Sequence, residues 1–549
     1  MKKFIIIGIS LTILAGVCFA ALPWQKYSYW QNWGGLNDNL SSTEIADGEA
    51  SDLQNVVFDT GGAIKKRFGY LTITADTFYT ISGDTGVVVT GLYFFKENDN
   101  DRHLIAIGNV GGKAVASKKT YSVGGGLPAG PWTIIDGTGN LPQTGYGDDK
   151  LVSFTTAENL AVFAMSSTNG QKAFKWGGAD SNLSLVTTDA DCPESSIVVY
   201  HKNHLFTNDT DNPSRIFFSN LDDITTCTAT DFIDIQTNDG TKVRGMVSAL
   251  DSLYIFKDKS IWRLSGTERD TWFLQKMIDG VGTLSHQSIA ILGNKIFFTT
   301  NQNDIAVYNG AFELVFLSQK IRTSIGGLNF SRATNNLGIG FSAYKNNDYD
   351  YYVATSTAGV STNNRVLLFD TAFNAWTKFV GLNANAWTVC DNSSTVGKNS
   401  LCFGDYSGYV HQYPSSSYYD GDVSDTAINA YYVTKWFRYP DISLGDKYWR
   451  VLKTYTQSET SSNTYLTAEA RADYQAAGKA LSLGLSTEGS LWDDFVWDAD
   501  VWSGTGLITH RSEIEKGKNM FQLKLSNSLV NQGFTVFGWE MFIEPTDRD

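Results

Sequence analysis

This chain has few charged residues, no closely spaced cysteine pairs and no catalytic sequence motif, and each of these absences argues against a class of protein or site. Only 18% of the 549 residues are charged, so the composition is not that of a disordered, highly solvated protein. The five Cys include no Cys-x-x-Cys spacing, which argues against a zinc site. No Gly-x-Ser-x-Gly elbow, P-loop, dinucleotide fingerprint or His-Glu-x-x-His run occurs. We therefore expect no enzyme, no metal and no cofactor.

Aromatic residues and glycine are abundant instead. Phe, Trp and Tyr make up 13% of the chain, and 51 Gly accompany Ser, Thr, Asn and Asp clusters that are typical of turns. Only nine Pro and six Met occur. This composition favours short strands over long helices, and the length allows roughly two to four domains. The prediction is an all-β protein.

The chain is acidic. Its net charge is −14, from 57 acidic against 43 basic residues. Removal of Lys2 and Lys3 with an N-terminal segment would give −16, because 41 basic residues would remain against the 57 acidic ones. An acidic surface disfavours non-specific binding to nucleic acid or to an anionic membrane. It is compatible with DNA passing through a channel whose wall does not grip phosphates.

Residues 1–20 have the pattern of an export signal. Lys2 and Lys3 supply a positive start, residues 4–17 are apolar, and Ala20 ends a stretch of the kind a signal peptidase accepts. The apolar run is shorter than the roughly 20 residues that a bilayer span needs. We expect cleavage near Ala20 and no membrane span in the mature chain; retention of the segment as an anchor is the alternative.

Four further cysteines fit an exported chain. Cys192, Cys227, Cys390 and Cys402 are an even set, which permits two disulfides in an oxidising compartment. Cys390 and Cys402 end two strand-like runs that flank a polar loop, so they are placed to staple a hairpin. Four buried free thiols are the alternative.

One arrangement recurs from about residue 85 to residue 415: an apolar strand, a short turn, a second strand, a polar turn and an aromatic-rich third strand. The clearest pair is residues 247–266 and residues 289–310, whose ends lie 44 residues apart. That spacing is the period of a four-stranded propeller blade. Looser units occupy residues 88–109, 152–176, 197–220, 339–379 and 401–413. The repeats predict a β-propeller of six or seven blades.

The C-terminal part has longer runs of apolar and polar alternation, which are typical of a β-sandwich. We therefore divide the chain into a signal-like segment (1–20), an N-terminal strand and docking region (21–84), a β-propeller (85–415), a linker (416–427) and a C-terminal β-sandwich (428–549).

The densest acidic and aromatic cluster lies within residues 492–502. Its candidate binding residues are Trp492, Asp494, Trp497, Asp498 and Trp502. Indole faces beside carboxylates suit a loop that binds a glycan or a partner protein. The alternatives are an aromatic sandwich edge and a glycosidase site, although strand geometry would scatter the carboxylates over both faces.

Other polar groups give weaker signals. The acidic stretches at 97–101 and 346–350 offer oxygen ligands for Ca²⁺, with solvated hairpin turns as the alternative. His201 and His204 are close in the sequence, but in a strand their spacing would direct them to opposite faces, so we expect no metal there.

The most specific string lies near the N-terminus. It opens with Gly34-Gly35-Leu36-Asn37, continues through an acidic segment at 45–56, and closes with Lys65-Lys66-Arg67-Phe68-Gly69. Lys65, Lys66 and Arg67 are the strongest basic run in an acidic chain. They predict a site that docks an acidic partner; a solvated hairpin tip is the alternative.

This opening, taken as an ordered set, resembles that of tail-tube and nozzle-type proteins of tailed bacteriophages. The strings at 211–223, 254–257 and 370–379 are similar to blade segments of the same group, and the similarity extends over residues 31 to about 545. The resemblance implies a propeller followed by a sandwich, and a structural protein of a virion tail. It would form a ring, nozzle or tube around the DNA exit channel, with other copies and neighbouring tail proteins as partners and DNA only as passing cargo.

The export signal departs from that group, whose members usually assemble in the host cytoplasm. If the signal decides the location, the chain is exported to the periplasm or the cell exterior. The alternative function is then an exported propeller that acts as a lectin or adhesin and binds glycans or a surface partner.

Overall fold

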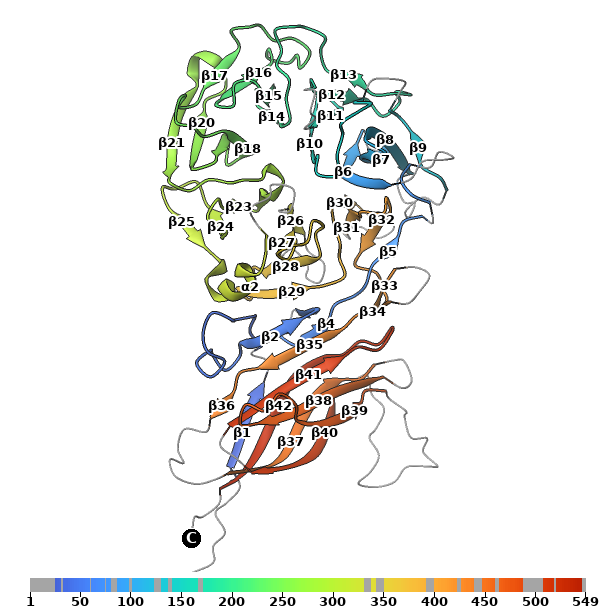
Figure 1. Ribbon diagram of the computed structural model, residues 1–549, viewed down its shortest axis with the longest axis vertical. Helices are drawn as coiled ribbons and strands as arrows, with labels where there is room; N and C mark the ends of the chain where they lie inside the picture. Colours follow the sequence, from blue (N-terminus) through green and yellow to red (C-terminus); the bar gives the residue numbers. More distant parts are fainter. Residues whose placement is uncertain are drawn as a thin grey trace, which may run out of the picture.

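The computed structural model describes residues 25–30, 33–59, 61–74, 76–79, 86–97, 101–122, 130–136, 141–165, 171–329, 337–341, 350–391, 399–421, 426–438, 447–459, 464–486, 507–517 and 520–545. These residues form a ring of small sheets with a second β domain beside it (Figure 1). The all-β prediction of a propeller and a sandwich is confirmed.

The described part of the ring holds seven antiparallel sheets of four strands, each ordered from the axis outward. The first four blades are β6 (Val87–Lys96), β7 (Asp101–Val110), β8 (Lys113–Ser122), β9 (Thr133–Ile134); β10 (Val152–Ala157), β11 (Leu160–Met165), β12 (Phe174–Trp176), β13 (Ser184–Leu185); β14 (Val198–His201), β15 (His204–Asn208), β16 (Arg215–Phe218), β17 (Phe232–Asp234); and β18 (Val243–Ala249), β19 (Ser252–Lys257), β20 (Ser260–Ser265), β21 (Phe273–Asp279).

The remaining three blades complete the circle. They are β22 (Ala290–Leu292), β23 (Lys295–Thr299), β24 (Ile305–Tyr308), β25 (Leu314–Phe316); β26 (Leu337–Phe341), β27 (Asp350–Thr355), β28 (Arg365–Asp370), β29 (Ala375–Phe379); and β30 (Ala386–Asp391), β31 (Asn399–Gly404), β32 (Val410–Tyr413), β5 (Leu71–Thr72). The outer strand of the seventh blade, β5, comes from before the first blade and pairs His411 with Thr72. The ring is thus closed by hydrogen bonds between its two ends.

The described residues of the second domain form two six-stranded sheets. One contains β1 (Gln25–Trp30), β3 (Val56–Phe58), β4 (Ile64–Lys66), β37 (Lys447–Gln457), β40 (Leu507–Gly517) and β42 (Thr535–Pro545); the other contains β2 (Ala50–Gln54), β35 (Ala430–Thr434), β36 (Phe437–Arg438), β38 (Tyr465–Ala472), β39 (Lys479–Gly484) and β41 (Met520–Asn527). Alternation places every second residue of β38 in the core between the sheets, from Leu466 to Ala472.

The predicted N-terminal region at 21–84 is not a separate unit. β1 to β4 are strands of the sandwich, and β5 is a strand of the propeller. Leu53, Val56 and Ile64 are fully buried, because their side chains lie in the sandwich core. A short N-terminal segment could not bury these apolar side chains by itself. The propeller is therefore inserted between two parts of the sandwich.

The remaining short elements connect these two domains or lie between blades. They are β33 (Tyr419–Asp420), which pairs with β34 (Thr426–Ala427), and the helical turns η1 (Arg269–Thr271), η2 (His286–Ser288), η3 (Ser318–Ile321) and α2 (Arg322–Gly326). Within the ranges given above, no helix has both the length and the apolar character required to cross a membrane.

One hydrophobic core continues from the sandwich into the propeller. It includes Trp33 and Trp539 of the sandwich together with Phe297, Phe369 and Trp376 of the fifth and sixth blades. The indole nitrogen of Trp376 donates to the Leu317 carbonyl oxygen at 2.9 Å, so this large side chain is fixed in orientation as well as buried. The two domains therefore share one continuous hydrophobic core.

Candidate functional sites at the joint and on the propeller axis

The opening string identified in the sequence builds the joint between the two domains. The Leu36 amide donates to the Trp376 carbonyl oxygen at 2.8 Å. A Cβ atom on Gly35 would lie 2.4 Å from the Trp376 nitrogen, so only glycine allows this approach. Lys378 of β29 forms an ion pair with Asp52 of β2 at 3.1 Å. The Gly-Gly turn and the acidic segment thus both contact the sixth blade.

Asn55 links three segments at the centre of the joint. Its Oδ1 atom accepts hydrogen bonds from the Val380 amide and from Arg67 Nε, each at 2.9 Å. Its Nδ2 atom donates to the Asn429 carbonyl oxygen at 2.9 Å. The residue has φ of 55°, a conformation that Asn tolerates better than most residues. Asparagine at this position therefore both adopts the left-handed backbone conformation and supplies the side-chain hydrogen bonds of the joint.

Arg67 completes this network with a buried ion pair. Its guanidinium donates to both carboxylate oxygens of Asp420 in β33, at 2.9 and 2.6 Å, and to the Val380 carbonyl oxygen at 2.8 Å. The side chain of Arg67 is fully buried, and that of Asp420 is 8% exposed. The paired fork geometry suits a guanidinium and a carboxylate. Arg67 thereby ties the chain entering the propeller to the chain leaving it.

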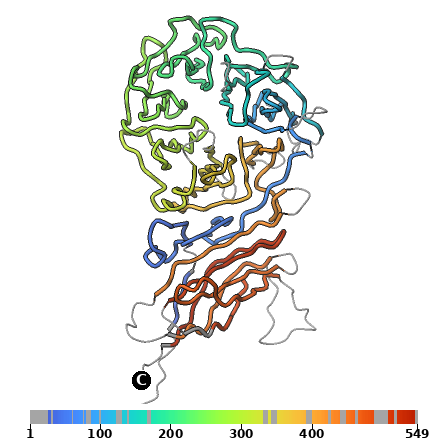
Figure 2. Tube along the Cα trace, in the orientation of Figure 1, coloured from blue at the N-terminus to red at the C-terminus, as the bar shows by residue number. Residues whose placement is uncertain are grey.

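The entering and leaving segments run side by side at this point (Figure 2). The Gly69 amide donates to the Ser417 carbonyl oxygen at 2.8 Å, and the Ser415 amide donates back to the Gly69 carbonyl oxygen at 2.8 Å. A Cβ atom on Gly69 would lie 1.6 Å from the Tyr419 carbonyl oxygen. The close of the opening string therefore needs glycine for steric reasons.

The predicted docking role of the basic run is wrong for Lys66 and Arg67, because both are fully buried. Lys66 Nζ donates to Asn527 Oδ1 at 2.8 Å and to the Leu529 carbonyl oxygen at 3.1 Å. Burial, together with the neighbouring Arg67 charge, lowers the pKa of Lys66 to about 7. Only Lys65 is partly exposed, with its Nζ atom 4.6 Å from the centre of the Phe68 ring. The alternation of Ile64, Lys65 and Lys66 in β4 was a sequence signal that Lys66 points inward.

A second candidate site lies on the propeller axis, where two hollows are separated by the turn η2. One hollow of about 220 Å³ is lined by the middle of the inner strands of the first, second, fourth, sixth and seventh blades. The other, of about 300 Å³, is lined by the segments that lead into the inner strands and has Asp149, Lys150 and Arg244 at its rim. Both are lined by His286 and Gln287.

His286 and Gln287 cross the axis and join blades that are not neighbours. Gln287 Nε2 donates to the Val152 carbonyl oxygen of the second blade at 2.7 Å. The Met246 amide of the fourth blade donates to His286 Nδ1 at 3.5 Å, so the other nitrogen, Nε2, carries the proton and donates to Ser153 Oγ at 3.0 Å. These contacts place His286 and Gln287 on the propeller axis, where both line the two hollows.

We expect acid to weaken this contact. Burial lowers the pKa of His286 to about 4, from an ordinary value of 6.5. The unfolded chain therefore binds a proton at a higher pH than the folded chain does. The stabilisation is complete above pH 6.5 and is lost as the pH falls to about 4, by at most about 3 kcal/mol.

Urea unfolding of the native chain and of a His286→Gln variant, across that pH window, measures the effect. The variant lacks the titrating ring, so its unfolding midpoint should depend less on pH than that of the native chain. Equal pH slopes for the two proteins would contradict the assignment.

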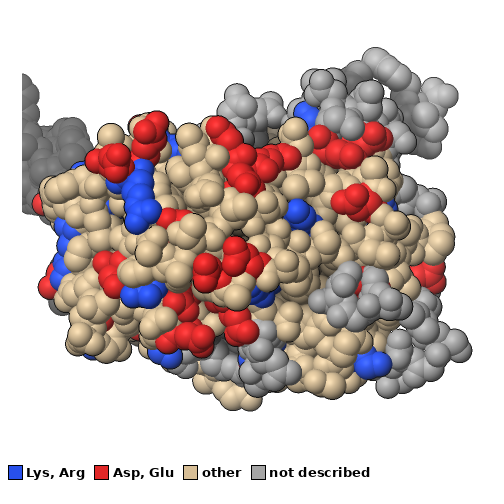
Figure 3. Space-filling view, turned by 90° about the horizontal axis from the view of Figure 1, so that it is seen from above, with Lys and Arg blue, Asp and Glu red and all other residues tan. Residues whose placement is uncertain are grey.

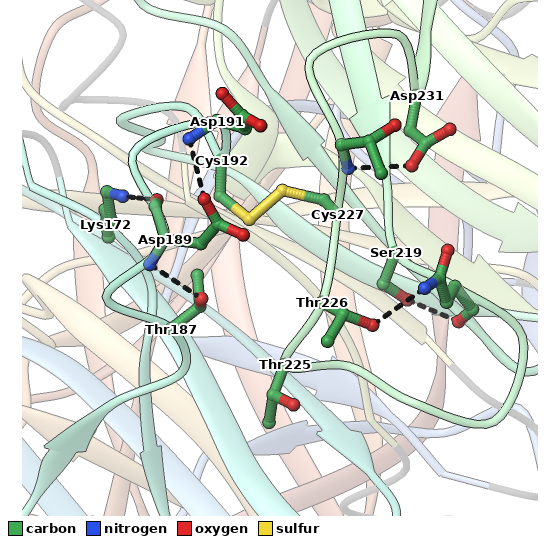
Figure 4. The surroundings of a disulfide bond; sticks show 12 residues. Lys172, Thr187, Asp189, Asp191, Cys192, Ser219, Thr225, Thr226, Cys227 and Asp231 are labelled. Carbon is green, nitrogen blue, oxygen red and sulfur yellow. Dashed lines mark hydrogen bonds between the residues drawn. A yellow bond between two sulfur atoms is a disulfide. The ribbon is translucent and has the colours of Figure 1, made fainter.

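The structure contains two disulfides. Cys192 lies between β13 and β14, Cys227 lies between β16 and β17, and their bond links the second and third blades, with Cα atoms 5.7 Å apart (Figure 4). Cys390 and Cys402 join the adjacent strands β30 and β31, with Cα atoms 6.1 Å apart. Beside the first bond, the Asp191 amide donates to Asp189 Oδ1 at 3.1 Å (Figure 4), which orders the loop that carries Cys192.

The remaining sequence-predicted sites have different outcomes. Trp492, Asp494, Trp497, Asp498 and Trp502 lie outside the described residues, as do residues 98–100 and 346–349 of the acidic stretches. His201 and His204 do not point to opposite faces as expected: they are direct partners across the β14–β15 hairpin. In the described part of the chain, no three His, Cys, Asp or Glu side chains converge in a way that would hold a metal ion.

No protein family and no curated protein sequence matches this chain. Solved structures with a similar fold include WD40 domains, which are β-propellers. The Neurospora crassa Pan2 WD40 domain is 7% identical with a TM-score of 0.36, covering 64% of this chain and 96% of that chain. The WD40 domain of Toxoplasma gondii coronin is 8% identical with a TM-score of 0.35, covering 72% and 86%. These similarities concern the fold alone.

The expectation that this chain is not an enzyme needs correction. An exo-β-1,3-galactanase from Phanerochaete chrysosporium, solved with β-1,3-galactotriose, is 8% identical with a TM-score of 0.26, covering 87% of this chain and 100% of that chain. Another similar structure is described as a glycoside hydrolase. These similarities too concern the fold alone, and the absence of a catalytic motif does not exclude catalysis by this chain.

Proposed function

We propose that this chain is a structural component of a phage-like tail, in which copies dock side by side as a ring, nozzle or tube around the DNA exit channel. The observation that carries the proposal is that residues of the opening string, 34–69, form the joint between the propeller and the sandwich. Gly35, Asn55, Arg67 and Gly69 all belong to the pattern by which the chain resembles tail proteins, and all four make contacts of a single joint. The pattern therefore specifies the propeller–sandwich architecture that the resemblance implies.

The construction of the joint supports this role. A ring subunit transmits load between neighbours, and a shared hydrophobic core with the buried Arg67–Asp420 pair opposes hinging of the propeller on the sandwich. Since His286 and Gln287 form contacts across the propeller axis, DNA in this proposal passes alongside the propellers, through a channel that several copies enclose.

The surface charge is compatible with such a channel. Seen from the propeller end, Asp and Glu side chains gather in several groups, with Lys and Arg scattered between them (Figure 3). A surface of this kind repels the phosphate backbone and does not retain DNA.

The test is to locate the native chain. Phage-like particles, periplasm and medium are purified from the same culture, and the chain is quantified in each by mass spectrometry, with its N-terminal peptide read. The proposal expects several copies per particle and a loss of assembled tails when the chain is absent. A chain found only in the periplasm or medium, beginning near Ala21, would overturn it.

The two disulfides favour a second candidate, an exported propeller that binds a glycan or a surface partner. Disulfides persist in oxidising compartments and are rare in the cytosol. The fractionation separates the two candidates. If the chain is exported, the native protein is tested on a glycan array beside a Trp497→Ala variant, and unchanged binding by the variant would exclude the tryptophan-rich loop as the site.

A further inference from the structure

The hollow of about 220 Å³ on the propeller axis is lined, among the described residues, by side chains without net charge. None of the described residues that line it is Asp, Glu, Lys or Arg, and the low pKa of His286 keeps that ring neutral at pH 7. A charged ligand would have no counter-charge there and would lose its hydration. The lining therefore selects for a neutral ligand.

Aromatic side chains from three consecutive blades form part of the wall. Tyr93, Phe154 and Trp387 come from the first, second and seventh blades and are all partly exposed. Tyr93 and Phe154 stack in parallel, with ring centres 5.0 Å apart. Trp387 Nε1 donates to the Gly338 carbonyl oxygen at 3.3 Å. The indole is thus held by its edge and packs in part against the hydrophobic cluster of the sixth and seventh blades, and the part of the ring that lines the hollow offers a flat apolar surface.

Two amide side chains supply acceptors. Asn385 uses its Nδ2 atom to donate to the Val89 and Asp148 carbonyl oxygens, at 2.7 and 3.3 Å. Gln287 uses its Nε2 atom to donate to the Val152 carbonyl oxygen. Because the NH₂ group of each amide is engaged with the wall, the oxygen of each remains to accept a hydrogen bond from a ligand. Thr388 Oγ accepts from the Phe94 amide at 3.3 Å and keeps its own proton to donate.

We propose that this hollow binds one neutral sugar ring. Sugar hydroxyls donate to amide oxygens, and the C–H face of the ring packs on an indole, so the ligand matches both kinds of wall. The volume is below the range of about 300–1,000 Å³ usual for drug-sized ligands, which limits the site to a single ring. This inference does not depend on the tail proposal, since a tail protein and an exported protein both meet glycans.

The test is ligand-observed NMR on the full native chain. Neutral probes are glucose, galactose, N-acetylglucosamine and their methyl glycosides; charged probes are glucosamine and glucuronate. We expect saturation transfer to at least one neutral probe and none to the charged ones. Binding of methyl glycosides would indicate that the end of a glycan can enter, whereas binding of free sugars alone would indicate a soluble ligand.

Two variants connect the signal to this hollow. Trp387→Ala should weaken binding by about tenfold, the loss expected when a ring loses its stacking partner. Trp262→Ala, at a partly exposed tryptophan of the fourth blade outside the hollow, is the matched control and should bind as the native chain does. Thr388→Val tests the polar wall if Trp387→Ala does not fold. Absence of binding by every neutral probe, or unchanged binding by Trp387→Ala or Thr388→Val, would overturn the proposal.

Discussion

Replacing Arg67 by Met is expected to lower the stability of the joint by about 3–5 kcal/mol, because it leaves the Asp420 carboxylate buried without its partner. The same substitution removes the donors to Asn55 Oδ1 and to the Val380 carbonyl oxygen. Calorimetry of the native chain and the variant measures the loss. Limited proteolysis should show earlier cleavage within residues 414–427, where the leaving segment depends on this pair.

The control for Arg67 is another bidentate pair that is exposed. Arg215 Nε and Nη2 bind the Asp234 carboxylate at 2.7 and 3.0 Å, but the two side chains are 25% and 38% exposed. Arg215→Met should cost less than about 1 kcal/mol. Substituting both buried partners, Arg67→Met with Asp420→Leu, should recover part of the loss. Equal effects of Arg67→Met and Arg215→Met would contradict the proposed importance of burial.

The second large effect is expected at the Cys192–Cys227 disulfide. The bond closes a loop with a sequence separation of 35, and its removal by Cys192→Ser with Cys227→Ser should lower stability by about 4 kcal/mol through the greater entropy of the unfolded chain. Thermal unfolding in the absence of reductant measures the loss. When reductant is added to both proteins, the native chain and the variant should unfold at similar temperatures, because the Cys390–Cys402 bond is then open in both.

The other disulfide provides an internal comparison. Cys390 and Cys402 are separated by only 12 residues, so the loop-entropy argument gives about 3 kcal/mol for that bond. The Cys390→Ser, Cys402→Ser variant should therefore unfold at a higher temperature than the variant of the first pair. The reverse order would show that contacts around the bonds, and not loop length, determine their effects.

The blades were predictable because their pairing is local. Residues 247–266 and 289–310 contain hairpins whose alternation and spacing can be recognised without knowing the rest of the fold, and both lie within blades. The sandwich strands after residue 428 were recognisable for the same reason, since apolar residues recur at every second position, as in β38.

The partners of the N-terminal strands were not predictable in this way. β1 pairs with β42, and β2 pairs with β35, across more than the length of the propeller. Nothing in the local pattern of a strand specifies a partner so distant in sequence. The burial of Lys66 and Arg67 was missed for a related reason: their acceptors, Asn527 and Asp420, lie far along the chain. The axial hollow was not predicted: the sequence pattern placed aromatic residues on the third strand of each unit, whereas Tyr93, Phe154 and Trp387 lie on the inner strands β6, β10 and β30.

The pairing of the first strand with the last has a consequence for synthesis on the ribosome. β3 pairs with β4 directly after it, but β1, β2 and β4 emerge before the propeller and their partners β42 and β35 follow only after it. At about 5–20 residues per second, the interval is on the order of tens of seconds. β5 also remains without its partner until β32, which ends at Tyr413, has been synthesised. Nascent chains therefore carry unpaired apolar strands for most of their synthesis, and a chaperone that shields them should increase the yield of folded protein.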